Sequence, residues 1–365
     1  MTSSESNVPA RAQARAPLQA KLARWLRGAI YALAVAYPVV LVAITIALWA
    51  FGETWWVTDL GLYLPRVLFA APLPVLVIAL LAYRAKRLLL TQLVAGLVLL
   101  FPLMGFSIPW PGWKSGDRPV LRVLSYNVNS GFGGLDQIVA EIEGYSPDVV
   151  LLQELFQGAD RAAEILRTKY PVVQTSTQFL VASRYPILSS VDPDRLPHEG
   201  RMRSPRFVQY RIDTPLGPIA FYNVHPVSPR HGLYRLRGAG LRREILTGRI
   251  FGGENANVLR SDSSLRGEQI EAVGHFADEE QDPVIIAGDT NLPGLSAFVR
   301  KYFSRYDDGF REAGWGFGYT FPANHRTWMR LDRVLASHEL KFVGFEVGHS
   351  RLSDHLCVVA DLQRR

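Results

Sequence analysis

The chain has 365 residues, of which 48% are hydrophobic and 20% are charged, and its formal net charge is +7. Its one cysteine, Cys357, excludes an intrachain disulfide bond and a zinc site built on cysteines. The charge excess lies in residues 1–116, which hold 10 Lys and Arg against 3 Asp and Glu, whereas residues 117–365 hold 30 of each kind. The basic excess therefore gives no support for a nucleic-acid-binding surface on the C-terminal part.

Three apolar stretches follow a basic N-terminal segment, residues 1–28. They are Ala29–Phe51, Val67–Tyr83 and Leu88–Ile108. A membrane span needs about 20 mostly apolar residues, so the first and third stretches are long enough, and the middle one is short. We expect a membrane anchor of three transmembrane helices over residues 29–108. An uncleaved signal anchor followed by a buried hairpin is the alternative.

Lys and Arg residues set the expected orientation of this anchor. They precede the first stretch and fill the "RAKR" loop at residues 84–87, whereas the loop "GETWWVTDLG" at residues 52–61 has none. The positive-inside rule then places the N-terminus and the RAKR loop in the cytoplasm. With three crossings, everything after Ile108 lies on the extracytoplasmic side of the inner or plasma membrane.

A short linker is expected at residues 109–118, where Trp110 and Trp113 would anchor the chain at the outer membrane interface. The domain that follows is expected to span residues 119–365. The lipid bilayer is then an expected partner of the chain, and nothing in the sequence indicates a protein partner.

From residue 119 on, short apolar runs alternate with amphipathic stretches. The runs predict strands at residues 120–128, 148–155, 179–184, 206–213, 218–226, 284–289, 330–337 and 356–362. Helices are predicted at residues 135–145 and 158–170, and a helix with a loop beside the site in residues 230–266. Many strands with only three or four helices favour an α/β sandwich of two packed sheets flanked by helices.

Polar residues recur at the ends of the predicted strands. They are Asn127, Glu154, His225, Asp289 with Asn291, Asp332, and Asp354 with His355. Asp289 and Asn291 lie two positions apart, so on an extended chain both would face one point beyond the strand. An ordinary Asp/Asn turn is the alternative for this pair. Carboxylate and amide oxygens suit Mg²⁺ or Mn²⁺, and histidines can donate to phosphate oxygens, so the set predicts metal-assisted hydrolysis of a phosphate ester.

Six motifs carry a resemblance to a known family: "SYNVNSG", "DVVLLQEL", "YNVHP", "IAGDTNLP", "RLDRVLAS" and "SDHLCVV". In this order the chain from about residue 121 to residue 362 resembles the endonuclease/exonuclease/phosphatase superfamily, which has the fold of DNase I. With its N-terminal anchor, it looks like membrane-anchored bacterial members. The resemblance implies a four-layer α/β sandwich. Abasic-site endonucleases often carry an acidic residue at the position of Asn129, which is neutral. This difference weakens the case for specificity in DNA repair.

The resemblance also implies a role for each site residue. Glu154, Asn127 and Asp354 would lie at the metal, which would be Mg²⁺ or Mn²⁺. Asp289 would orient and deprotonate the attacking water, and Asn291 would hold that water or the transition state. The remaining catalytic residues are His225, His355 and Asp332: the two histidines would bind phosphate oxygens, and Asp332 would fix the ring of His355.

Three functions stay open at this point. The first is a membrane-anchored phosphodiesterase or phosphatase acting on a lipid headgroup or another envelope phosphoester. Arg203, Arg206 and Arg230, among other arginines, could bind its anionic group, although a solvated charged face is the alternative. The second is an extracytoplasmic nuclease acting on DNA or RNA, which the domain's zero net charge disfavours. The third is a non-enzymatic binding protein on the same fold, which the complete set of site residues disfavours.

Overall fold

The structure, a computed structural model, describes residues 10–109, 119–235, 242–243, 246–248 and 254–365. Contacts divide the chain into two compact units. Unit 1 comprises Met1–Ile46 and Arg66–Met104, and unit 2 comprises Ala47–Pro65 and Gly105–Arg365. The segment Ala47–Pro65, which hydropathy assigns to the membrane anchor, therefore packs with the α/β part of the chain. The expected linker residues Trp110 and Trp113 lie outside the described residues.

The helices of unit 1 are apolar. Helix α1 covers Ala10–Phe51, α3 covers Pro72–Ala82, and α4 covers Leu89–Val98 and continues into a π-helical turn at Leu99–Leu103. Two helical stretches, Ala20–Thr54 and Lys86–Leu103, are long and apolar enough to cross a membrane. A third candidate is a pair, Trp56–Leu62 with Arg66–Ala82, bent by 89°. The count of three spans therefore remains a prediction.

The third apolar stretch was expected to stay helical to Ile108, and this is wrong. The helix ends at Leu103, after Pro102 has removed a backbone donor from its last turn. Gly105 then takes the left-handed conformation, with φ +77°, which a helix cannot continue through.

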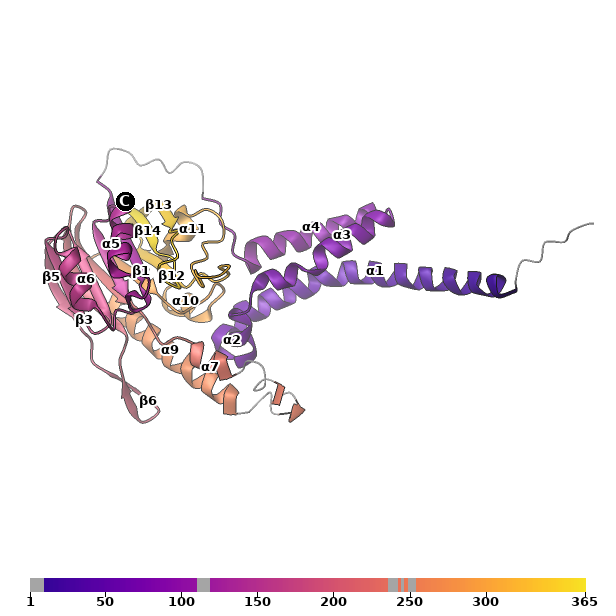
Figure 1. Cartoon of the computed structure of the whole chain (residues 1–365), viewed down its shortest axis with the longest axis horizontal. Helices are drawn as coiled ribbons and strands as arrows, with labels where there is room; N and C mark the ends of the chain where they lie inside the picture. The colour runs from indigo at the N-terminus through magenta and orange to yellow at the C-terminus, as the bar shows by residue number, and fades with distance from the viewer. Residues whose placement is uncertain (1–9, 110–118, 236–241, 244–245, 249–253) are drawn as a thin grey trace, which may run out of the picture. The chain divides into compact units, whose positions relative to one another are not determined.

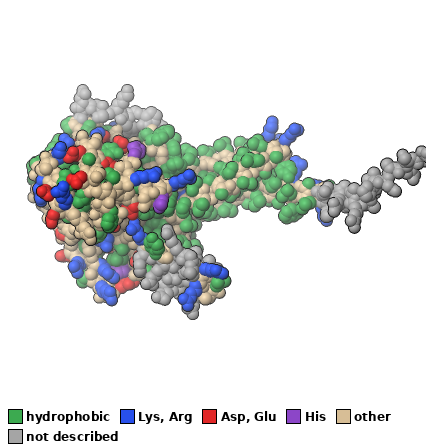
Figure 2. All heavy atoms as spheres, in the orientation of Figure 1, with side chains coloured by type: hydrophobic (Ala, Val, Ile, Leu, Met, Phe, Trp, Pro, Cys, Tyr) green, Lys and Arg blue, Asp and Glu red, His purple; other side chains and the backbone are tan. Residues whose placement is uncertain are grey.

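Arg27 of α1 lies beside the C-terminal end of α3, after which the basic RAKR loop begins. The Arg27 guanidinium lies 6.0 Å from the centre of the Tyr83 ring, and its Nε donates to the Tyr31 hydroxyl at 2.9 Å. Figure 2 shows Lys and Arg side chains gathered at this end and hydrophobic side chains over the remaining helix surface. The apolar surface of these helices is compatible with membrane anchoring.

Unit 2 contains two six-stranded sheets. The first has, in order across it, β13 (Leu340–Val347), β14 (Val358–Arg364), β1 (Leu121–Asn127), β2 (Val149–Gln153), β4 (Phe179–Ser183) and β3 (Val172–Ser176). The second has β11 (Tyr306–Asp308), β12 (Asp332–Ser337), β10 (Val284–Asp289), β9 (Gly217–Val224), β8 (Phe207–Thr214) and β5 (Ile187–Val191). A separate hairpin joins β6 (Leu196–His198) to β7 (Arg201–Arg203).

Three clusters of buried apolar side chains hold together the sheets and helices that Figure 1 shows. Residues such as Val123 and Ile285 fill the space between the sheets. The outer face of the first sheet packs on α5 (Leu135–Gly144) and α6 (Ala159–Leu166), and that of the second on α9 (Glu254–Asp278) and α10 (Ala297–Tyr302). The expected sandwich of two mixed sheets between helices is confirmed. Unit 2 also contains the short helices α2 (Trp56–Leu62), α7 (Arg230–Arg235) and α11 (Gly309–Ala313).

The strand directions bring the predicted polar residues to one edge of the sandwich. Strands β1 and β2 are parallel, as are β9 and β10, so their carboxyl ends point the same way within each sheet. The expectation that Asp332 and the Asp354–His355 pair end strands is wrong, because they lie at or before the starts of β12 and β14. These two strands run antiparallel to β10 and β1, so their starts reach the same edge.

Candidate active site

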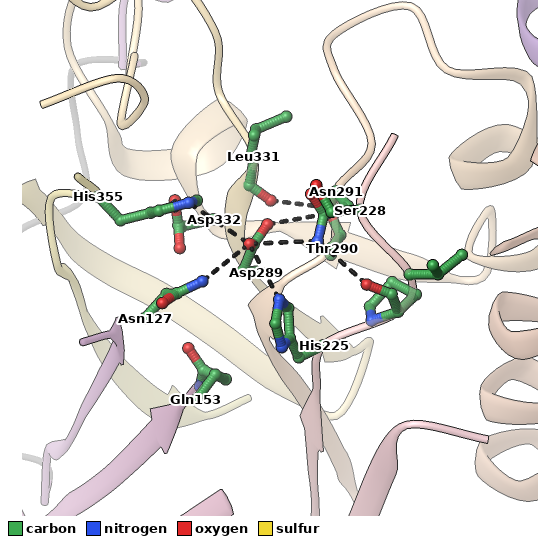
Figure 3. A network of polar contacts seen from close by, with 12 residues as sticks. Asn127, Gln153, His225, Ser228, Asp289, Thr290, Asn291, Leu331, Asp332 and His355 are labelled. Carbon is green, nitrogen blue, oxygen red and sulfur yellow. Dashed lines mark hydrogen bonds and ion pairs between the residues drawn. The ribbon is translucent and has the colours of Figure 1, made fainter. Parts of the chain in front are cut away.

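Asp289, the last residue of β10, lies at the centre of the site (Figure 3). Its side chain is almost fully buried, and its Oδ2 faces four nitrogens. Asn127 Nδ2 donates to it at 3.1 Å, across the gap between the two sheets. Nε2 of His225 lies 3.6 Å away, and Nε2 of His355 lies 3.5 Å away. One carboxylate oxygen therefore joins residues from both sheets.

Asn291 reaches Asp289 through a turn and not along an extended strand. Its φ is +50°, its backbone N–H donates to Asp289 Oδ1 at 2.9 Å, and its side-chain Nδ2 lies 3.3 Å from Oδ2. The same Nδ2 donates to the Pro226 carbonyl at 3.1 Å. Both interpretations of Asp289 and Asn291, as a turn and as part of the site, therefore apply. The Asp289 carboxylate closes the turn with one oxygen and faces the site with the other. Gly288, which precedes Asp289, allows β10 to approach β9 closely, because a Cβ there would overlap the carbonyl oxygen of Val224.

His355 is held between two carboxylates. Its Nδ1 lies 2.8 Å from Asp332 Oδ2, and the Phe321 ring packs against its imidazole with the ring centres 4.7 Å apart. Burial by itself would lower the pKa of His355, but the charges of Asp332 and Asp289 outweigh it and raise the pKa to about 10. His355 is therefore a cation at neutral pH, with Nε2 directed to the centre of the site.

His225 has the opposite electrostatic state. Burial lowers its pKa to about 4, with Asp289 opposing the shift, so the ring is neutral at pH 7. Its Nδ1 lies 2.7 Å from Gln178 Oε1. The Gln178 amide can accept from a protonated Nδ1 or, turned over, donate to a bare one. In the second arrangement the ring proton is on Nε2, where it can be donated to a phosphate oxygen.

Glu154 follows β2 directly and takes a left-handed conformation, with φ +61°. Burial raises its pKa; a hydrogen bond from Asn127 opposes this, and the charges of Asp289 and Asp354 add to it. Oδ1 of Asp354 is buried without a hydrogen-bond partner, while its Oδ2 accepts from Arg230 Nη2 at 2.9 Å. The negative charges of these carboxylates repel one another, and Oδ1 of Asp354 and the amide of Asn127 lie beside them. Such a group of oxygen ligands fits a hard divalent cation.

A second set of atoms could also hold a metal. One ligand atom each from Asp289, Asp332 and His355 lie within 4.8 Å of one another. A metal there would have to displace the proton of His355, whose pKa is raised to about 10 by the same carboxylates. The protonated His–carboxylate pair is therefore the better account of this trio, and the edge at Glu154 is the better metal position.

The three predicted arginines lie in different surroundings. Arg206 is half-buried; burial lowers its pKa, and the charge of Glu154 opposes that shift. Arg230 reaches the site through its bond to Asp354. Arg203 is exposed on β7, in the β6–β7 hairpin. Only Arg206 and Arg230 are thus placed beside predicted site residues by a contact or a charge interaction. Of the other arginines, Arg237 lies outside the described residues.

Several supporting residues were not named from the sequence. Ser353 accepts from the His355 N–H at 3.2 Å and donates to the Asn127 carbonyl at 2.7 Å. Gln153 Nε2 donates to Asn223 Oδ1 at 2.8 Å, which links the sheets under the site. Ser353, Gln153 and Asn223 lie inside the quoted motifs, one or two positions from a residue that the sequence predicted for the site. Gln178 lies in no motif and had no signal.

Solved structures of similar fold were found at low sequence identity. One is an endonuclease/exonuclease/phosphatase from Beutenbergia cavernae, with 20% identity, 68% of this chain and 72% of that chain covered, and a TM-score of 0.48. Another is an endonuclease/exonuclease/phosphatase family protein from Bacteroides thetaiotaomicron, with 15% identity, 68% of this chain and 100% of that chain covered, and a TM-score of 0.48. A mannosyl-6-phosphatase from the same species has 15% identity, with 66% of this chain and 99% of that chain covered, and a TM-score of 0.45. A search among curated proteins found no match. The family model described as Endonuclease/Exonuclease/phosphatase matches residues 124–355, and the chain belongs to that family.

Proposed function

We propose that the chain is a membrane-anchored, divalent-metal-dependent phosphoester hydrolase that acts on a lipid headgroup or another phosphoester of the cell envelope. Members of the family are generally phosphoester hydrolases and commonly depend on a divalent metal. The observation that carries the proposal is the buried Asp289 carboxylate, which faces a neutral imidazole on one side and a cationic imidazole on the other.

The site residues then have distinct tasks. Asp289 orients a water and takes its proton as the water oxygen attacks phosphorus, and the bond from phosphorus to the leaving oxygen breaks on the opposite side. Asn291 holds the water, and Asp332 keeps the ring of His355 oriented. The cationic His355 stabilises the negative charge that grows on the phosphate oxygens, and His225 donates from Nε2.

Glu154, Asn127 and Asp354 are the residues that would hold Mg²⁺ or Mn²⁺. The metal, when bound, supplies Lewis-acid charge stabilisation at a phosphate oxygen. Arg206 and Arg230 are proposed to bind the anionic part of the substrate, and Arg203 is a weaker candidate.

The membrane placement belongs to the same proposal. Three spans, a cytoplasmic N-terminus and an extracytoplasmic unit 2 would confine the site to the membrane surface, which favours a lipid or envelope substrate over nucleic acid. The zero net charge of residues 117–365 supports that preference. A nuclease is the second candidate, and a non-enzymatic binding protein the third.

The test is hydrolysis by the full chain in detergent or vesicles, in which wild type is compared with Asp289→Ala. Asp136→Ala, an exposed acid on α5, is the control variant. The panel contains bis-p-nitrophenyl phosphate, p-nitrophenyl phosphate, phospholipid vesicles and plasmid DNA, each with Mg²⁺, Mn²⁺ or EDTA. We expect metal-dependent turnover of a phosphoester that only Asp289→Ala abolishes. Preference for DNA would replace the lipid proposal with the nuclease, and absence of all turnover would favour the binding protein.

A further inference from the structure

The segment Ala47–Pro65, which starts within the first apolar stretch and ends just before the second, packs inside unit 2. Its residues Trp56, Asp59, Leu62 and Tyr63 are at most 6% exposed. Gly52 approaches so closely that a Cβ there would lie 2.7 Å from the Cβ of Ala297. A loop that only joined two membrane helices would have no reason to bury charged and aromatic side chains in this way.

The contacts of this segment fall on the loop that carries Asn291. The hydroxyl of Tyr63 donates to the Asn291 carbonyl at 2.9 Å. At the other end of the loop, Glu53 Oε2 accepts from the backbone N–H of Ala297 at 2.8 Å, and Arg300 donates to the Trp49 carbonyl. Residues 49–63 thus contact both ends of the loop formed by residues 291–297.

Tyr63 supplies the last fixed bond of Asn291. The backbone N–H of Asn291 is held by Asp289 and its side-chain Nδ2 by Asp289 and Pro226, so the carbonyl is its remaining backbone polar group. Asn291 has the left-handed conformation, which non-glycine residues adopt only when surrounding contacts hold it. Burial raises the pKa of the Tyr63 hydroxyl well above its usual value, so this group remains a donor.

Tyr63 is itself held from two directions. Its carbonyl accepts from Trp328 Nε1 at 3.3 Å, and the guanidinium of Arg266 lies 5.8 Å from the centre of its ring. Arg266 is fully buried, lies 3.8 Å from Asp59, and donates to the Val227 carbonyl at 3.2 Å, two residues after His225. Tyr63 is therefore a rigid support and not a side chain that happens to lie near the site.

From these contacts we infer that Tyr63 is a positioning residue, which fixes the backbone conformation of Asn291. The segment Ala47–Pro65 then contributes to the geometry of the active site. This inference rests on the proposed function for its effect on catalysis, but the contact itself can be tested without any substrate. In sequence, Tyr63 lies three residues before Arg66, where the next helical stretch begins.

The test compares Tyr63→Phe with Tyr170→Phe in the full chain in detergent. Tyr170 is a matched control, since its buried hydroxyl also donates to a backbone carbonyl, that of Pro147, at 3.1 Å, in the helix layer of the first sheet. With bis-p-nitrophenyl phosphate as the substrate and saturating metal, Tyr63→Phe should lower kcat about tenfold and leave KM unchanged. A tenfold loss is the size expected when one buried hydrogen bond is removed. Tyr170→Phe should lower the melting temperature and leave kcat unchanged.

A double-mutant cycle shows whether Tyr63 acts through Asn291. Adding Tyr63→Phe to Asn291→Ala should change kcat by less than about twofold, because the group that Tyr63 positions is already gone. Loss of the full tenfold in that background, or an unchanged kcat in the single variant, would overturn the inference.

Hydrogen exchange gives a readout that needs no activity. The backbone amides of residues 290–292 and 294–296 should exchange faster in Tyr63→Phe than in wild type, and should be unchanged in Tyr170→Phe. If wild type hydrolyses nothing but this difference is found, the proposed function fails while the positioning of Asn291 stands. Equal exchange in all three proteins would overturn the positioning itself.

Discussion

Nδ1 of His355 lies 2.8 Å from Oδ2 of Asp332, and both side chains are buried at the edge where the two sheets meet. This contact points Nε2 of His355 toward Asp289 and keeps the imidazole charged. Asp332→Asn should therefore lower kcat about 100-fold with little change in KM, as when a transition-state donor is lost. Steady-state kinetics with the diester substrate measure this.

The control is Asp307→Asn in the neighbouring strand β11. Asp307 Oδ2 also lies near a histidine, 3.1 Å from His338 Nδ1, but that histidine is 66% exposed. This variant should keep the wild-type kcat. If Asp332→Asn also kept it, His355 would not depend on its carboxylate partner.

Metal removal tests the acidic edge at Glu154. Treatment with EDTA should abolish turnover, and Mg²⁺ or Mn²⁺ should restore it. Because Glu154→Gln removes a proposed ligand charge, the metal concentration for half-maximal activity should rise at least about tenfold. Glu164→Gln, an exposed glutamate on α6, is the control and should titrate like wild type. Equal metal requirements in both variants would argue for the alternative trio around His355.

The buried strands were the part of the fold that the sequence could predict. Strands β2 and β10 are mostly apolar runs and β1 is almost fully buried, and each is followed by or ends in a polar residue. Strand β5 was not predicted, because four of its five residues are exposed and its pattern, "ILSSV", resembles a loop. The strands that hold the site are therefore the ones that hydropathy detects, and the outer strands are not.

Position in space was harder to predict than residue type. Asp332 was identified as a site residue although it begins β12, since only the antiparallel pairing with β10 brings its side chain to the edge. The bond from Tyr63 to Asn291 joins residues 228 positions apart. No local pattern in an apolar, aromatic loop signals such a partner, so hydropathy assigned that loop to the anchor.

The arginines should differ in their effect on substrate binding. Arg206→Gln should raise KM for the diester about tenfold or more, because the half-buried guanidinium beside Glu154 can form a charged hydrogen bond to a phosphate oxygen. Arg203→Gln, on the exposed β6–β7 hairpin, should leave KM unchanged within about twofold. The two KM values come from the same kinetic assay. A larger effect at Arg203 would move the proposed substrate contact from the Glu154 edge to the hairpin.

Stability at acid pH should depend on Asp308. Its carboxylate accepts from Arg330 Nη1 at 2.6 Å and from Arg333 Nη1 at 3.2 Å, and all three side chains are at most 12% exposed. Burial by itself would raise the pKa of Asp308, but the two arginines outweigh burial and hold the pKa well below its usual value. The unfolded chain thus binds a proton at a higher pH than the folded chain does. The stabilisation is present above about pH 4 and is lost as the pH falls below it.

Asp308→Asn should lower the free energy of unfolding at pH 7 by about 3–5 kcal/mol, because it leaves buried arginines without their counter-charge. It should also flatten the acid part of the stability profile, since the titrating group is gone. Urea unfolding of the full chain at pH 7, 5 and 3, followed by tryptophan fluorescence, measures both effects. Asp136→Asn, whose ion pair with Arg161 is exposed, should match wild type throughout. Parallel losses of stability between pH 5 and pH 3 in wild type and Asp308→Asn would assign the acid sensitivity to another carboxylate.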